Sequence, residues 1–249
     1  EAWRADAALE HASIAAFGAL ALDLVALGAP PSLLERTHEA ALDEVAHARD
    51  CFALASAYGG EPVTAAPFPE VAAPRMRESK SARLRRVAIE SAIDGCLGEG
   101  TAADAARVAS QCAEDPAVAE VLGRIARDEQ RHADLAWDIL AWCLEQDPAL
   151  LEPVREAVAR SRAPRVERDL PKHGRVGSDV WAASHERVRR ALEARLDTVE
   201  SSADAAVPAV VPVHAATSAP QVVDARDPRA RPGDRRDRPV SVPRARGHD

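Results

Sequence analysis

The strongest constraint on this chain is a six-residue pattern, D-E-x-x-H-A, which occurs at residues 43–48 and again at residues 128–133. Each copy lies within a long segment rich in alanine and leucine, a composition that favours helix. Side chains three residues apart share one face of a helix, so the Glu and His of each copy point the same way. Such a pair can hold a metal ion, and the second copy makes chance a poor explanation.

The composition favours an all-α protein in which one domain is followed by a tail. Aromatic residues make up only 3% of the chain and runs of β-branched residues are short, which suits helices packed over small side chains. The composition changes near residue 163. We expect a four-helix bundle with a short fifth helix over residues 1–162, and an accessory segment with one amphipathic helix over 163–200. Residues 201–249, rich in Pro, Ala, Arg and Asp, are predicted to form a disordered tail.

Hydrophobic periodicity places the four long helices at residues 3–27, 31–58, 81–112 and 116–146, with shorter ones at 149–161 and 178–200. The connection between the second and third helices carries four prolines and has no helical period. Its 22 residues, 59–80, can span up to ~70 Å, whereas a helix of 25 residues is only ~38 Å long. The third helix can therefore begin parallel to the second, as in bundles with one long crossover.

Ionisable residues interrupt the apolar stripe of every long helix. They are Glu10 on the first, Glu44 and His47 on the second, Glu99 on the third, and Glu129 and His132 on the fourth. Glu90 and Asp94 are rival ligands on the third helix, but both lie on more polar faces than Glu99. Four buried carboxylates are costly unless they are protonated or paired with cations, and two divalent ions would cancel their charge. The competing interpretation, buried Glu and His that only hydrogen-bond to each other, requires six coincident positions.

Three glycines, Gly95, Gly98 and Gly100, surround Glu99 in the third helix. Each glycine costs up to ~1 kcal/mol relative to alanine in a helix interior, so their presence calls for a reason. One interpretation is a close backbone approach or a π-bulge beside a site. The other is tight helix packing without a functional role.

The ligand pattern and the long crossover resemble the ferritin-like (rubrerythrin-like) di-iron carboxylate superfamily over about residues 3–146. The resemblance also concerns Asp43 and Asp128, which would each orient the histidine of the opposite copy, although both can be read as ordinary exposed acids. For the ligands it implies that Glu44 and Glu129 bridge two metal ions, Glu10 and Glu99 are terminal carboxylates, and His47 and His132 bind one ion each.

The function implied by this resemblance is that of an oxidoreductase with two Fe ions, or Mn ions, that uses O2 or peroxide and an external electron donor. Oxygenation of an organic substrate, peroxide reduction and ferroxidase action are the three chemistries to consider. The chain has no C-x-x-C pair, so it lacks the rubredoxin-like donor of a full-length rubrerythrin, and its extra helices argue against a plain ferritin cage. The alternative is a non-enzymatic iron-binding, iron-storage or structural module.

Charge and hydropathy limit the partners. The formal net charge of −8 argues against binding to nucleic acid. The sequence contains no run of ~18 apolar residues, so no membrane span is predicted. The four cysteines form no framework of disulfides and are expected to be reduced. A homodimer is compatible with the resemblance. The chain opens with Glu1 rather than Met, so a leader can be missing, and the cytoplasm is the favoured compartment.

Overall fold

A computed structural model of the chain describes residues 1–67, 78–166 and 169–206. The described residues form helices and connecting loops without a β-strand, which confirms the predicted all-α class. The predicted tail lies outside the described residues from Val207 onward.

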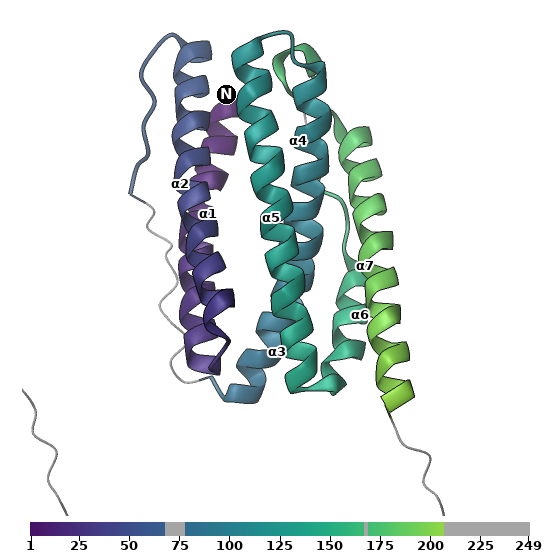
Figure 1. Cartoon of the computed structure of the whole chain (residues 1–249). Coiled ribbons are helices and arrows are strands. Elements are labelled where there is room, and N and C mark those ends of the chain that lie inside the picture. Colours follow the sequence, from purple (N-terminus) through teal and green to yellow (C-terminus); the bar gives the residue numbers. More distant parts are fainter. Residues whose placement is uncertain (68–77, 167–168, 207–249) are drawn as a thin grey trace, which may run out of the picture. The chain divides into compact units, whose positions relative to one another are not determined.

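The first two helices, α1 (Ala2–Leu27) and α2 (Pro31–Gly59), pack against each other as an antiparallel hairpin (Figure 1). Gly28 ends α1 in the left-handed conformation, with a φ of 78°, which is accessible to glycine because it has no Cβ. Proline cannot continue a helix but is well placed in a first turn, so Pro31 opens α2 directly afterwards.

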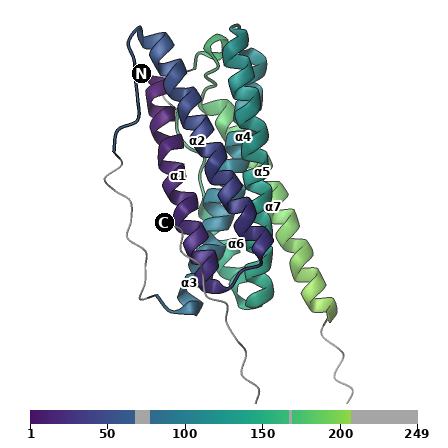
Figure 2. The same ribbon diagram turned by 60° about the vertical axis from the view of Figure 1, so that its left-hand side comes forward.

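The third long element is a continuous run of α3 (Lys80–Glu90), a π-helical segment η1 (Ser91–Glu99) and α4 (Gly100–Cys112). It is followed by α5 (Pro116–Gln146), which Asp115 caps by accepting a hydrogen bond from the backbone N–H of Ala117 at 2.9 Å. Figures 1 and 2 show that α2 and the α3–α4 run point in one direction, whereas α1 and α5 point in the other.

The C-terminal part comprises a short 3₁₀ turn, η2 (Pro148–Leu150), then α6 (Leu151–Arg160), a 3₁₀ turn η3 (Pro171–His173) and α7 (Ser178–Ala206). Helix α7 packs on α4, η1 and α6. It ends at Ala206 instead of the predicted Glu200, so the first residues assigned to the tail are helical. Alanines continue the segment and the next proline is Pro208, which explains the longer helix.

The buried apolar side chains form two clusters, and the predicted ligands fall between them on every long helix. One cluster includes Phe17, Leu24, Ala40, Leu97, Leu135 and Ile139. The other includes Trp3, Ala7, Cys51, Ala105, Val118 and Ile125. The ionisable residues thus occupy a polar layer that divides the core.

Helix α1 has an unusual outer surface for a helix that also lines the core. By length and composition alone it is apolar enough to cross a membrane, and Leu9, Leu22 and Val25 are exposed on it. Mostly buried core helices pass the same test, but most of the apolar window of α1 is not buried, although Trp3, Ala7 and Leu24 pack against its neighbours. The absence of a membrane span therefore stays a prediction.

The segment around Glu99 combines a π-helical backbone with tight helix packing. Residues Ser91–Glu99 adopt the π-helical conformation, a feature that is rare and frequent at functional sites. Packing is also tight, because a Cβ added at Gly95 would lie 2.3 Å from the Cβ of Ala136 on α5. A side chain at Gly95 would force the π-helical segment away from α5.

The close contact at Gly95 leads to a stability prediction. We expect Gly95→Ala to lower the free energy of unfolding by about 1–3 kcal/mol, because overpacking displaces η1 from α5. Gly18→Ala on α1 is the control, since no atom lies within 4 Å of its added Cβ, and it should stabilise by about 0.4–1 kcal/mol. Urea unfolding measures both values. Equal effects of the two substitutions would contradict the packing argument.

Candidate metal centre

The structure brings the six predicted ligands together in the polar layer between the two apolar clusters. Four elements supply them: α1 gives Glu10, α2 gives Glu44 and His47, η1 ends on Glu99, and α5 gives Glu129 and His132. Donor atoms of these residues fall into two groups, each with all atoms within 4.8 Å of one another.

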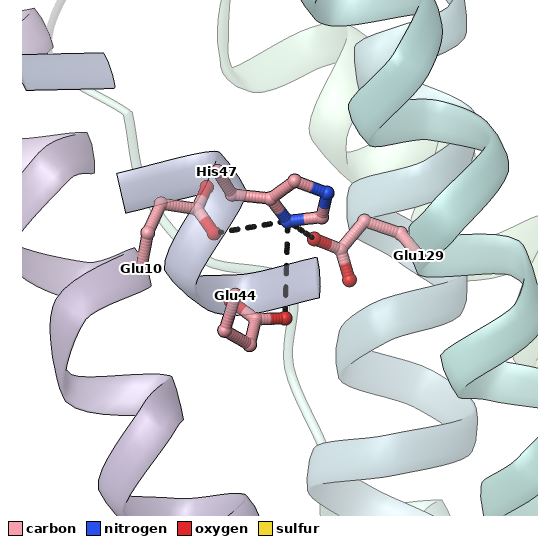
Figure 3. Close-up of side chains that lie close together, drawn as sticks. All are labelled: Glu10, Glu44, His47 and Glu129. Carbon is pink, nitrogen blue, oxygen red and sulfur yellow. Dashed lines mark ion pairs between the residues drawn. The ribbon is translucent and has the colours of Figure 1, made fainter. Parts of the chain in front are cut away.

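The first group contains Glu10, Glu44, His47 and Glu129. The Nδ1 atom of His47 lies 3.6 Å from Oε2 of Glu10, 3.9 Å from Oε1 of Glu44 and 3.3 Å from Oε1 of Glu129. Figure 3 shows these carboxylates converging on that nitrogen from three helices. One nitrogen and three carboxylates thus surround a common point.

The second group contains Glu99, Glu129 and His132. The Nδ1 atom of His132 lies 3.2 Å from Oε2 of Glu129 and 3.2 Å from Oε1 of Glu44. Glu129 therefore presents one oxygen to each histidine, and Glu44 lies beside both rings. These two carboxylates are placed where a bridge between two ions would need them.

Several donor atoms in this layer lack a partner. Glu44 and His47 have side chains that are 1% and 0% exposed. Both carboxylate oxygens of Glu44 and Nδ1 of His47 have no hydrogen bond of acceptable geometry among the described residues, although other ligand atoms lie close to them. Buried polar atoms are normally satisfied, and leaving one without a partner costs about 1–3 kcal/mol. A bound cation would satisfy all three atoms, so the residues fit a metal ion.

The pKa values of the buried carboxyl groups are shifted in different directions, because some carboxyls lie mainly beside other carboxylates and one lies between the two histidines. Burial, together with the neighbouring Glu129 and Glu10 carboxylates, raises the pKa of Glu44 to about 7. Burial and the charge of Glu129 also raise the pKa of Glu99 well above its usual value. Burial opposes ionisation of Glu129 as well, but its contacts with His132 and His47 prevail and lower its pKa.

The histidine pKa values are raised. Burial alone would lower the pKa of His47, but its contacts with Glu10, Glu129 and Asp128 outweigh burial and raise it to about 11. Glu129 and Glu44 likewise overcome the burial of His132 and raise its pKa to about 9. Without a cation, the layer therefore keeps protons at neutral pH, where a metal ion would compete for the same lone pairs.

The acids that precede each E-x-x-H glutamate contact the histidines crosswise. Asp128 Oδ2 lies 3.0 Å from Nε2 of His47, and Asp43 Oδ2 lies 3.2 Å from Nε2 of His132. An Nε2–H that donates to a carboxylate fixes the ring and leaves Nδ1 free to bind metal. This is the geometry expected of orienting acids rather than of solvated surface acids.

Sequence reasoning missed Arg131, which lies between the two ligands of the second copy. Its guanidinium contacts Asp43 at 2.9 Å and Asp128 at 2.6 Å. The D-x-x-R spacing within the motif could have indicated the second contact, because residues i and i+3 are neighbours on a helix. Of the rival ligands, Glu90 pairs with Arg86 at 2.9 Å and Asp94 is exposed, so neither joins the two groups.

The chemistry of this layer follows from its donors. Carboxylate oxygens predominate, two imidazoles complete the set, and little solvent reaches the central atoms. A buried cluster of this kind could hold a metal ion. Comparisons with known proteins found no matching family model, curated protein or solved structure.

Proposed function

We propose that this chain is a ferritin-like carboxylate protein that binds two Fe or Mn ions and acts as an O2- or peroxide-dependent oxidoreductase. The observation that carries the proposal is the pair of ligand groups sharing Glu129, each with one histidine. Further support comes from the two helical hairpins, in which the first helix supplies one Glu and the second supplies Glu-x-x-His. The shared direction of α2 and α3–α4 suits a four-helix bundle with one long crossover.

The distances support the proposed ligand roles. Glu44 and Glu129 lie beside both histidines and would bridge the two ions. His47 and His132 would each bind one ion through Nδ1, which faces the carboxylates. Glu44 belongs to the first group but also lies 3.2 Å from His132 of the second, whereas Glu10 pairs with His47 and Glu99 joins the group of His132, so Glu10 and Glu99 would be terminal ligands. Four carboxylates would neutralise two divalent ions.

The metal type is proposed from ligand chemistry. Oxygen-rich sites with imidazole suit Fe(II) and Mn(II), whereas softer ions prefer sites with thiolates. When bound, a pair of such redox-active ions supplies electrons to O2 or peroxide. The chain itself would orient the ligands through Asp43 and Asp128. It would also keep water out, partly with Phe17, whose ring packs edge-on against that of His132 with 5.1 Å between the ring centroids. A separate reductant would return the electrons, because the sequence carries no C-x-x-C pair.

The proposal is tested by metal analysis and reactivity of the full chain. We expect anaerobic Fe(II) titration to saturate at about two ions per chain, as the two ligand groups require. Exposure to O2 or peroxide should then oxidise the bound iron, with a new near-ultraviolet absorption band. Uptake of hundreds of iron ions per assembly would indicate storage, and binding of none would contradict the metal centre.

A further inference from the structure

The guanidinium group of Arg131 connects the two histidines of the candidate metal centre through two aspartates. From His47, the path runs through Asp128 to the guanidinium of Arg131, and from there through Asp43 to His132. Its four steps measure 3.0, 2.6, 2.9 and 3.2 Å, all within hydrogen-bonding distance. Arg131 uses a different terminal nitrogen for each acid, Nη1 for Asp128 and Nη2 for Asp43.

The two motif copies differ at this position. Arg131 of the second copy corresponds to Ala46 in the first, so the first copy offers no equivalent cation. Both orienting acids therefore share one guanidinium. Its fork of donors can hold two carboxylates at once, which the compact ammonium of lysine does less well.

The burial of these groups places Arg131 on the solvent side of the path. Its side chain is 58% exposed, whereas those of Asp43 and Asp128 are 28% and 12% exposed. Replacing Arg131 thus removes a contact with the acids without opening a cavity in the core. The acids would then lose the donor that fixes their orientation, and each could rotate away from its histidine.

We propose that Arg131 is a positioning residue for both metal ions of the proposed site, because it holds Asp43 and Asp128 in the orientation that directs Nδ1 of each histidine toward the ligand cluster. This inference rests on the proposed function. It assigns to one surface residue an effect on two ions that it does not touch. Removal of Arg131 therefore weakens the binding of both ions, whereas removal of either acid weakens mainly the binding of one ion.

The test compares Arg131→Ala, Arg131→Lys and the matched control Arg127→Ala in the full chain. Arg127 lies one turn earlier on α5, is exposed and forms no ion pair among the residues that the structure describes. Anaerobic Co(II) titration, followed by the visible absorption of the bound ion, gives the affinity of each equivalent. We expect Arg131→Ala to lower the affinity for each of the two Co(II) ions about tenfold or more, as loss of orienting contacts does at other metal sites. Arg127→Ala should change neither more than about twofold, and Arg131→Lys should recover part of the loss.

A spectroscopic measurement separates positioning from a merely structural ion pair between α2 and α5. In the Zn(II)-loaded protein, ¹⁵N NMR should detect slowly exchanging Nε2–H protons on His47 and His132. Arg131→Ala should speed exchange at both rings, Asp128→Asn mainly at His47, and Asp43→Asn mainly at His132. A structural ion pair would lower the melting temperature without this pattern.

The outcomes distinguish this inference from the proposed function. Wild-type protein that binds two Co(II) ions, with Arg131→Ala unchanged or weakened at one equivalent only, would overturn the role of Arg131 and leave the function standing. Wild-type protein that binds no metal would overturn both. If Arg131→Ala fails to fold, Arg131→Lys decides, because a lysine that matches wild type at both equivalents and both rings contradicts the need for a forked donor.

Discussion

We expect that replacing Glu44 and Glu129 together by alanine abolishes metal binding and leaves the helices formed. Glu129 belongs to both ligand groups, and Glu44 lies beside both histidine rings, so the pair contributes to every position an ion could occupy. Metal content should fall from two ions per chain to near zero, measured by elemental analysis after anaerobic loading with Fe(II) and desalting.

The helices should still form after this double substitution, but the metal-free variant should be less stable than the metal-free wild type, because two buried, protonated histidines lose their carboxylate partners. Both side chains are almost fully buried, and removing one partner of a buried ion pair costs about 3–5 kcal/mol, because the other charge stays buried and uncompensated. Alanine is a strong helix former, so the helices themselves should not be disrupted. We therefore expect the metal-free variant to show the wild-type helical signal by circular dichroism and to melt below the metal-free wild type.

A matched pair, Glu39→Ala with Glu120→Ala, controls for the loss of two negative charges. Glu39 lies on α2 and Glu120 on α5, both exposed and outside the ligand groups. This variant should bind two ions with unchanged affinity. If Glu44→Ala/Glu129→Ala still bound two metal ions per chain, the site would be refuted, because the four remaining ligands include neither of the proposed bridging carboxylates.

Much of the site could be predicted because local periodicity determines which side chains share a helix face. Glu10, Glu44 and Glu129 each occupy a position where an apolar residue was expected, and such a departure is visible in the sequence alone. The choice of Glu99 over Glu90 followed from the same rule. The structure brings Glu99 to Glu129 and leaves Glu90 paired with Arg86 at the surface.

The missed features depend on how helices align, which periodicity does not specify. The contact of Arg131 with Asp43 joins residues 88 positions apart and requires the register of α5 against α2. The length of the π-helical segment was not predicted either, because glycines permit several backbone conformations. The exposed leucines of α1 illustrate the same limit, since an apolar stripe does not reveal how much of it other helices cover.

The metal-free protein should lose stability as pH rises from 6 to 9, whereas the metal-loaded protein should not. His47 and His132 have pKa values of about 11 and about 9 in the folded chain, above the ordinary histidine value of 6.5. A raised pKa means that the folded state keeps a proton that the unfolded chain releases. The resulting stabilisation is complete below pH 6.5 and is lost as pH rises through 9 and then 11.

The carboxyl groups do not reverse this trend between pH 6 and 9. Glu44, raised from 4.5 to about 7, acts in the same direction, because its contribution to stability is also lost as pH rises through its folded pKa. Asp128 and Glu129 have lowered pKa values, so their contributions are present above the ordinary values of 3.8 and 4.5 and stay constant over this range. The metal-free protein should thus lose about 1.4 kcal/mol per pH unit for each extra proton held by the folded state.

Metal binding offsets this loss, because the ions need deprotonated ligands. Each proton displaced from a histidine makes the affinity rise about tenfold per pH unit in the range below the folded pKa. Stabilisation by a ligand grows with the logarithm of its concentration over its dissociation constant, so the gain from added metal should increase from pH 6 to 9. Urea unfolding under anaerobic conditions, with chelator or with excess Mn(II), measures both stabilities at each pH.

Two histidine variants assign the effect to the metal centre. His47→Gln/His132→Gln should flatten the pH dependence of the metal-free protein, because the two rings that retain protons are gone. His38→Gln, an exposed position on α2 outside the ligand groups, should keep the wild-type slope. A metal-free stability that rises between pH 6 and 9 would mean that the rings are not held among carboxylates, since only those neighbours can overcome the cost of burying a charged imidazole.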